Sequence, residues 1–368
     1  MYLPTKAAEN FIGPDDVILT VEKYGRGVIH DTYLVKLRGL ADSFILQRMN
    51  TYVFKQPERI MHNLRVVGEH IRNLEKPAES NAGSRWEMLH IIPTGEQRDY
   101  FIDPEGGFWR ALSFISGAYP LEEVAGLDNA REIGRALGKF HHLTCNIDPK
   151  LLHDTLPGFH NIEFYLKRYD LVLSNYASKE PVNADLYCRE FIAGRRQWAP
   201  VLENGRKHGK LQMRVIHGDP KINNIMLDEQ TGRAVSIIDL DTMKPGLLLY
   251  DIGDCLRSCC NVIGEDAENP AGDLFDLERC SSVLSGYMTE ARKCLTGRDF
   301  ALFYDAIRLL PFELGLRFYT DYLEDNIYFK TDYPVQNLNR AVVQFRLVES
   351  IEQQEDRIKS LIEKYCLM

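Results

Sequence analysis

The sequence predicts an α+β fold of two lobes, with a small lobe over residues 1–115 and a larger lobe over residues 116–368. The chain has 368 residues, and single hydrophobic cores usually divide beyond about 250–300 residues. Extended segments gather in the first lobe, where they predict a small antiparallel sheet with one long helix over residues 58–76. After residue 116 apolar residues recur mostly at helical spacing, which predicts a mainly helical lobe.

Composition narrows the class of protein. A hydrophobic share of 45% and a charged share of 26% are ordinary for a globular chain. The net charge of −9 argues against a general nucleic-acid surface, and no apolar run reaches the ~18 residues of a membrane span. The eight cysteines show no zinc-like spacing, and the N-terminus lacks a signal-peptide pattern. We expect a cytoplasmic protein that binds neither nucleic acid nor membrane, as a monomer or weak homodimer.

The stretch 213–254 places polar residues where apolar runs end. Asp219 follows a short apolar run, Asn224 comes five residues later, Asp239 ends the next run, and Asp251 opens an apolar helical segment. One such Asp is more often a turn or cap residue. The ordered set instead predicts phosphoryl transfer, with one carboxylate for an acceptor hydroxyl and an amide and a carboxylate for magnesium on ATP.

Several stretches carry a resemblance to a known family. They are GRGVIHDTYLV, FILQRMN, INNIMLD, IIDLDTMKPGLLLYDIGD and GLRFYTDYLEDNIYFKTDYPVQNL, and together they span nearly the whole chain. They resemble the bacterial N-acetylhexosamine 1-kinases, of the aminoglycoside phosphotransferase and choline kinase superfamily. The resemblance implies a protein-kinase-like fold and ATP-dependent phosphorylation of the anomeric 1-hydroxyl of N-acetylglucosamine or N-acetylgalactosamine. The expected partners are therefore ATP, Mg²⁺ and a small sugar.

The same resemblance assigns roles within the catalytic stretch. Asp219 is expected to be the base, and Lys221, two residues later, to be the cation that contacts the γ-phosphate. Magnesium is expected to be held by Asn224 and Asp239, with Asp241 as a second metal contact because it lies on the same face of an extended segment.

Two further residues of this stretch are expected to be structural. Asp251 is predicted to brace the catalytic loop by accepting backbone hydrogen bonds rather than to touch the substrate. His217 is likewise expected to be structural.

In the first lobe, Gly25 and Gly27 lie in a predicted turn between two strands. Glycines let backbone N–H groups approach phosphates closely, although two glycines alone would favour a plain hairpin if nothing followed downstream. By the resemblance, Phe114 and Ile115 form the interlobe segment whose backbone pairs with adenine.

The third predicted strand departs from the superfamily pattern. Gln47 occupies the position usually held by a cation for the α- and β-phosphates, while Arg48 follows and points to the opposite face by strand alternation. Either Gln47 contacts the nucleotide without charge, or a bulge re-aims Arg48.

The acceptor signal lies late in the chain. Glu313, Arg317 and Asp321 are spaced by four and share one helix face, a pattern that from sequence alone favours an ion-pair ladder. By the resemblance, Arg317 and Tyr328 match sugar-contacting positions. Asn223 is a further candidate for substrate binding.

Two other functions remain open at this point. Another small-alcohol kinase, acting on choline, homoserine or an aminoglycoside, would share the same acidic and amide residues. A non-catalytic nucleotide-binding module is the second, because Gln47 replaces the usual cation.

Overall fold

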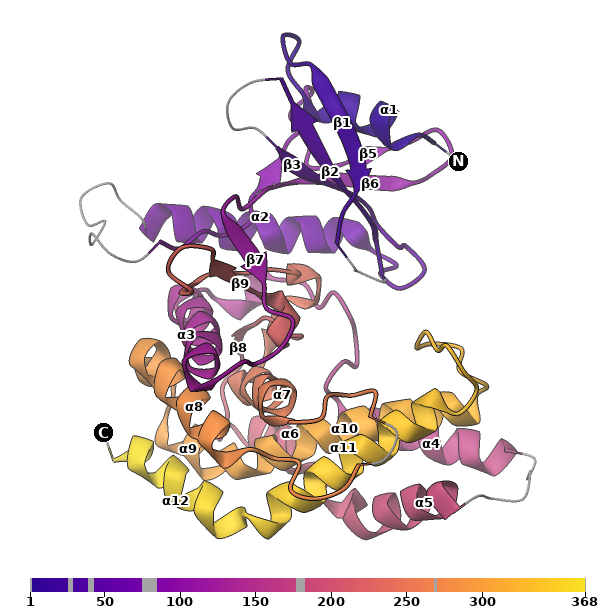
Figure 1. The fold of residues 1–368 in the computed structure, drawn as a ribbon, viewed down its shortest axis with the longest axis vertical. Helices are drawn as coiled ribbons and strands as arrows, with labels where there is room; N and C mark the ends of the chain where they lie inside the picture. The colour runs from indigo at the N-terminus through magenta and orange to yellow at the C-terminus, as the bar shows by residue number, and fades with distance from the viewer. Residues whose placement is uncertain are drawn as a thin grey trace. The chain divides into compact units, whose positions relative to one another are not determined.

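The protein forms two compact units in a computed structural model that describes residues 2–25, 29–38, 43–74, 85–176, 183–267 and 270–367 (Figure 1). The sheet unit comprises Met1–Pro120, Asn146–Pro157 and Met226–Pro245, and the helical unit comprises Leu121–Cys145, Gly158–Ile225 and Gly246–Met368. One unit holds an antiparallel sheet and the other is mainly helical, which confirms the α+β class. The lobe boundary between residues 115 and 116 stays a prediction, because both units are discontinuous in sequence.

The sheet unit is built on antiparallel strands in the order β1-β2-β3-β6-β4, with β5 paired to β6. The strands are β1 (Ile18–Lys23), β2 (Asp31–Leu37), β3 (Phe44–Arg48), β4 (Ile91–Ile92), β5 (Phe101–Ile102) and β6 (Phe108–Ser113). A smaller sheet holds β7 (Ala118–Pro120), β9 (Ile225–Asp228) and β10 (Ala234–Ile237).

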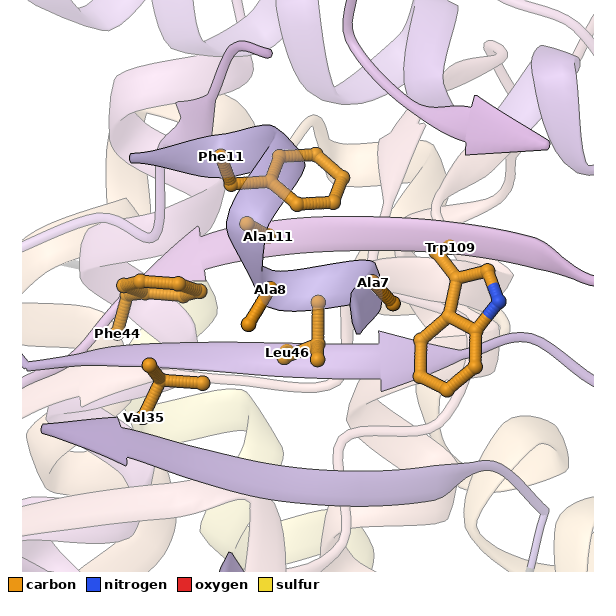
Figure 2. Close-up of a cluster of buried hydrophobic side chains, with 8 residues drawn as sticks. All are labelled: Ala7, Ala8, Phe11, Val35, Phe44, Leu46, Trp109 and Ala111. Atoms are coloured by element: carbon orange, nitrogen blue, oxygen red, sulfur yellow. The ribbon is translucent and has the colours of Figure 1, made fainter. Parts of the chain in front are cut away.

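One face of the larger sheet is covered by α1 (Pro4–Ala8) and η1 (Glu9–Phe11), as Figure 2 shows. The buried cluster contains Ala7, Ala8, Phe11, Val35, Phe44, Leu46, Trp109 and Ala111. Burying one large apolar side chain contributes about 1.5–3 kcal/mol, so these contacts fix which face is the core. Because successive strand residues alternate, Gln47 and Arg110 must lie on the opposite face.

Helix α2 (Pro57–Leu74) is the long helix of this unit and confirms the predicted amphipathic segment. Its buried Asn63 donates to the carbonyls of His153 and Met243, both at 2.9 Å, and accepts from the His153 N–H at 2.9 Å. One amide thus satisfies three backbone groups from two other segments, which fixes the chain just after Asp241.

The helical unit contains the helices that follow α2. They are α3 (Leu127–Thr144), α4 (Ile162–Asn175), α5 (Asn183–Arg195), α6 (Val201–Lys207), α7 (Leu248–Cys260), α8 (Leu277–Ala291), α9 (Gly297–Ala301), α10 (Phe303–Leu323), α11 (Gln336–Gln353) and α12 (Glu355–Cys366). Among the residues that the structure describes, no helix combines the length and apolar character needed to cross a membrane.

Helices α3 and α8 approach closely because glycines face the contact. A Cβ added at Gly134 of α3 would meet the Val283 carbonyl, and one added at Gly286 of α8 would meet the Arg131 carbonyl. Backbone cannot move aside as a flexible side chain can, so these positions require glycine for steric reasons.

We expect Gly134→Ala to lower the free energy of unfolding by about 1–3 kcal/mol, because the methyl group overpacks the α3–α8 contact. Gly68→Ala in α2 is the matched control, since nothing lies within 4 Å of its added Cβ. That change should be neutral or stabilising by up to ~1 kcal/mol. Urea unfolding of both variants measures the difference, and equal midpoints would contradict the tight contact.

Candidate active site

The catalytic loop, residues 217–224, joins β8 (Arg214–Ile216) to β9 and ends in η4 (Ile222–Asn224). Lys221 Nζ lies 2.7 Å from Asp219 Oδ2, and Asn224 Nδ2 donates to the Asp219 carbonyl at 2.7 Å. Asn223 Nδ2 donates to the carbonyl of Leu121, the residue that follows β7, at 3.3 Å. The loop is therefore folded back on Asp219.

Asp251, in the first turn of α7, binds the backbone of the catalytic loop. Its carboxylate accepts from the backbone N–H of His217 at 2.6 Å and of Gly218 at 2.8 Å, and it lies 2.8 Å from His141 Nε2. The other His141 nitrogen contacts the Tyr287 hydroxyl at 2.8 Å. Burial alone would raise the pKa of Asp251, but His141 and these N–H groups outweigh it and hold the pKa below its usual value.

Arg317 on α10 lies between three aromatic rings. Its guanidinium carbon is 5.0 Å from the Phe159 ring centroid, 5.2 Å from that of Tyr165 and 5.4 Å from that of Phe329. These are cation–π distances, and they orient the guanidinium without consuming its N–H donors. Nη1 lies 3.9 Å from Glu313 Oε1, one turn earlier on the same helix.

Arg317 and Asp219 are near enough to interact electrostatically. Burial would lower the pKa of Arg317, but Tyr165, Glu313, Tyr328 and Asp219 together raise it above its ordinary value. In the helical unit, the charge of Asp219, the predicted base, therefore acts on Arg317, the predicted acceptor-binding residue.

Tyr328 is presented by a loop that Asp321 organises. Asp321 accepts from the backbone N–H of Tyr328 at 2.7 Å and of Phe329 at 2.9 Å, and from Asn337 Nδ2 at 2.9 Å. The Tyr328 side chain itself is half exposed. The predicted Glu313, Arg317 and Asp321 stripe is thus not a solvated ladder, because all three side chains are largely buried and their partners differ.

The sheet unit holds a buried charge network centred on Arg110 of β6. Arg110 Nε donates to Gln47 Oε1 at 2.9 Å, while Nη1 and Nη2 lie 2.6 and 2.8 Å from the two Asp241 oxygens. His30 Nε2 contacts Asp241 Oδ2 at 2.6 Å. The Asn50 N–H donates to His30 Nδ1, which places the ring hydrogen on Nε2.

Asp241 is therefore an ion-pair partner. Burial would raise the pKa of this carboxyl, but Arg110 and His30 outweigh it and hold the pKa far below its usual range. Both oxygens face cations or donors of the protein itself. The role of Asp241 as a second metal contact stays a prediction.

The bulge proposed for Arg48 is absent from the strand register. Thr32 pairs with Gln47 and Asp31 with Arg48, and β3 pairs with β6 through the same residues without a shift. Arg48 instead approaches Gly107 on the α1 side of the sheet. The idea that a bulge re-aims Arg48 toward the Gln47 face was wrong.

The remaining predicted residues lie at ends and turns of the sheet unit. Gly25 has φ +75°, and Gly27 lies outside the described residues. Ile115 is buried in an apolar cluster, while the Phe114 ring packs edge-on against Tyr24 at 5.9 Å.

Asp239 follows β10 and immediately precedes η5 (Leu240–Thr242). It adopts the left-handed conformation, with φ +63°, which is uncommon for a residue with a side chain. Such conformations concentrate at functional sites, where the surroundings hold them in place.

Two buried residues with several polar contacts, Arg110 and His160, were not predicted from the sequence. Arg110 could have been found, because strand alternation puts it on the Gln47 face once Trp109 is placed in the core. His160 gave no such signal, because it is a lone histidine in an irregular segment and its contacts come from distant parts of the chain.

We expect Asp241→Asn to lower the free energy of unfolding by about 3–5 kcal/mol at neutral pH, because it leaves Arg110 buried without its counterion. The pKa of Asp241 is depressed in the folded state, so its contribution is present above the unfolded-state pKa and is lost as pH falls through the folded one. Urea unfolding at neutral and acidic pH measures this. The exposed Asp31→Asn is the control and should change stability by less than about 0.5 kcal/mol.

Comparison with known proteins gives the family. The chain matches the model of the phosphotransferase enzyme family (APH) over residues 20–281. It is similar to the aminoglycoside phosphotransferase of Alicyclobacillus acidocaldarius (12% identity, TM-score 0.62, covering 97% of each chain) and to a choline kinase of Cryptosporidium parvum (12% identity, TM-score 0.59, covering 95% of this chain and 93% of that one). A microcompartment-associated aminopropanol kinase is similar at 16% identity and TM-score 0.56, with 97% of each chain covered. These likenesses confirm the two-lobed protein-kinase-like fold, and because the family model spans well over half of the chain, the protein belongs to the phosphotransferase enzyme family.

Proposed function

We propose that this phosphotransferase transfers the γ-phosphoryl group of ATP to the anomeric 1-hydroxyl of N-acetylglucosamine or N-acetylgalactosamine, giving the sugar 1-phosphate. The observation that carries the proposal is the buried guanidinium of Arg317 near Asp219. A fixed positive charge on the acceptor side disfavours a cationic acceptor such as choline or an aminoglycoside. It favours a neutral acceptor with hydroxyl and amide oxygens, which an N-acetylhexosamine provides.

Asp219 would act as the base. As the acceptor oxygen bonds to the γ-phosphorus, its proton passes to the Asp219 carboxylate, and the bond from phosphorus to the ADP oxygen breaks. Lys221, which is paired with Asp219 in this structure, would turn to the γ-phosphate when ATP is present. Asp251 and His217 would keep the loop in place throughout.

The donor set fits magnesium. Asn224 commits its Nδ2 to the Asp219 carbonyl, so its Oδ1 is the atom that would accept a metal, and Asp239 would supply a carboxylate. Both are hard oxygen ligands, as Mg²⁺ prefers. When bound, the ion would neutralise charge on the β- and γ-phosphates.

The other nucleotide contacts would come from the sheet unit. The turn with Gly25 and Gly27 would let backbone N–H groups approach the phosphates, and the backbone of Phe114 and Ile115 would pair with adenine. Gln47, whose Oε1 accepts from Arg110 Nε, would contact the nucleotide without charge. Tyr328 and Asn223 would complete the acceptor side.

The proposal predicts a definite acceptor profile. With ATP and Mg²⁺, ADP release should be stimulated by N-acetylglucosamine or N-acetylgalactosamine and should fall to background when EDTA removes the metal. Preferred turnover of choline, homoserine or an aminoglycoside would replace the proposal with another small-alcohol kinase. ATP binding without turnover of any acceptor would favour a non-catalytic module.

Asp219→Asn should lower kcat by about 10²–10⁴-fold, because the amide cannot accept the hydroxyl proton. The Kd for ATP, measured by calorimetry, should stay within about threefold because the substitution preserves shape and leaves the nucleotide contacts in place. If the variant keeps turnover within a few-fold of the unsubstituted enzyme, Asp219 is not the base.

Arg317→Lys should raise the acceptor KM by about tenfold and leave the KM for ATP unchanged, because lysine keeps the charge but loses the planar fork of donors. Arg98→Lys, at a largely exposed position of the sheet unit, is the matched control. Equal acceptor KM values for the two variants would contradict the assignment of Arg317.

A further inference from the structure

His160 lies where three segments of the helical unit meet. It precedes α4, is almost fully buried, and stacks on Tyr250 of α7 with a centroid distance of 5.2 Å and an interplanar angle of 16°. Its φ of +65° is uncommon for a residue with a side chain and costs about 1 kcal/mol or more. Such a conformation persists only where the surroundings hold it.

Both nitrogens of the His160 ring face oxygen atoms that accept hydrogen bonds. Nε2 lies 2.8 Å from the Gly218 carbonyl, which can only accept, so Nε2 carries a hydrogen. Nδ1 lies 3.3 Å from Glu313 Oε1, an ion-pair distance without hydrogen-bond geometry, and it has no hydrogen-bond partner among the residues that the structure describes. A second proton on Nδ1 would place a positive ring directly beside this carboxylate.

The charged groups around His160 favour that form. Burial alone would lower the pKa of His160, but Glu313 on α10 and Asp254 on α7 outweigh it, and the pKa lies above its ordinary value. Arg317 on α10 lies 3.9 Å from Glu313, and Arg257 pairs with Asp254. The His160 ring is thus influenced by two carboxylates, Glu313 and Asp254, and each of them is also near one arginine.

The two contacts of His160 lead to the two sides of the proposed reaction. Gly218 immediately precedes Asp219, and its N–H is held by Asp251 while its carbonyl is held by His160. Glu313 is one turn before Arg317 on α10. The His160 ring therefore links the peptide just before Asp219 to the helix that carries Arg317.

We propose that His160, as an imidazolium bridging Gly218 and Glu313, is a positioning residue that sets Asp219 relative to Arg317. The proposal rests on the assignment of Asp219 as the base in the proposed function. It goes beyond that function in requiring a charged histidine that touches neither substrate nor nucleotide.

Steady-state kinetics of His160→Gln and Glu313→Gln test this role. His160→Gln should lower kcat by roughly tenfold to a hundredfold with the KM for ATP little changed, because a displaced base impairs transfer more than nucleotide binding. The exposed His208→Gln is the matched control and should keep both parameters. If His160→Gln lowers thermal stability but leaves kcat within about twofold, its role is only structural and the proposal is overturned.

The pH dependence of kcat separates positioning from packing. The unsubstituted enzyme should lose kcat as pH rises through the raised pKa of His160, because the imidazolium then deprotonates. Glu313→Gln should move that alkaline limb to lower pH, since it removes the carboxylate that favours the charged ring. If the alkaline limb of kcat lies at the same pH in the unsubstituted enzyme and in Glu313→Gln, the proposal is overturned.

A measurement without turnover keeps this test distinct from the acceptor assignment. In side-chain ¹H–¹⁵N spectra of the whole protein, the histidine signals lost in His160→Gln should show both ring nitrogens protonated at neutral pH. A neutral ring would overturn the proposal whatever the acceptor. The kinetic tests can use whichever acceptor the enzyme phosphorylates, whether an N-acetylhexosamine, choline, homoserine or an aminoglycoside. A lack of turnover with N-acetylhexosamines therefore counts against the proposed function alone.

Discussion

The catalytic loop depends on one buried carboxylate. Asp251 satisfies two successive backbone N–H groups of the loop and also contacts His141, so a single side chain joins α7, α3 and the residues before Asp219. Each N–H left without a partner in this environment would cost about 1–3 kcal/mol. The close approach of α3 to α8 at glycine positions fixes His141 from the other side, because its second nitrogen meets Tyr287 of α8.

In the sheet unit, the buried charge of Arg110 is balanced by Asp241 and hydrogen-bonded to Gln47. Arg110 meets a glutamine through Nε and a carboxylate through both terminal nitrogens, a geometry that uses the planar fork of a guanidinium. A lysine has one compact ammonium and could not make these contacts at once. The contacts of this buried cation on β6 are therefore those of an arginine rather than a lysine.

Sequence patterns predicted the parts that depend on local order. Strand alternation and helical spacing gave the sheet, the α2 helix and the α+β class, and the spacing of Asp219, Asn224 and Asp251 identified the loop that the structure shows folded on Asp251. What the sequence patterns did not predict depends on non-local contacts. The ion pair of Asp241 with Arg110 joins positions far apart in the sequence, and His160 was missed because its partners come from two other segments.

The loop after α10 is held through its backbone, while the Tyr328 side chain is half exposed. Asp321 grips the main chain at positions 328 and 329 and makes no demand on the identity of those side chains, whereas the Tyr328 ring reaches outward. Replacing the Tyr328 side chain therefore leaves the hydrogen bonds that hold this loop in place. If Tyr328 contacts the acceptor as proposed, the contact can be changed without altering the residues that support Asp219.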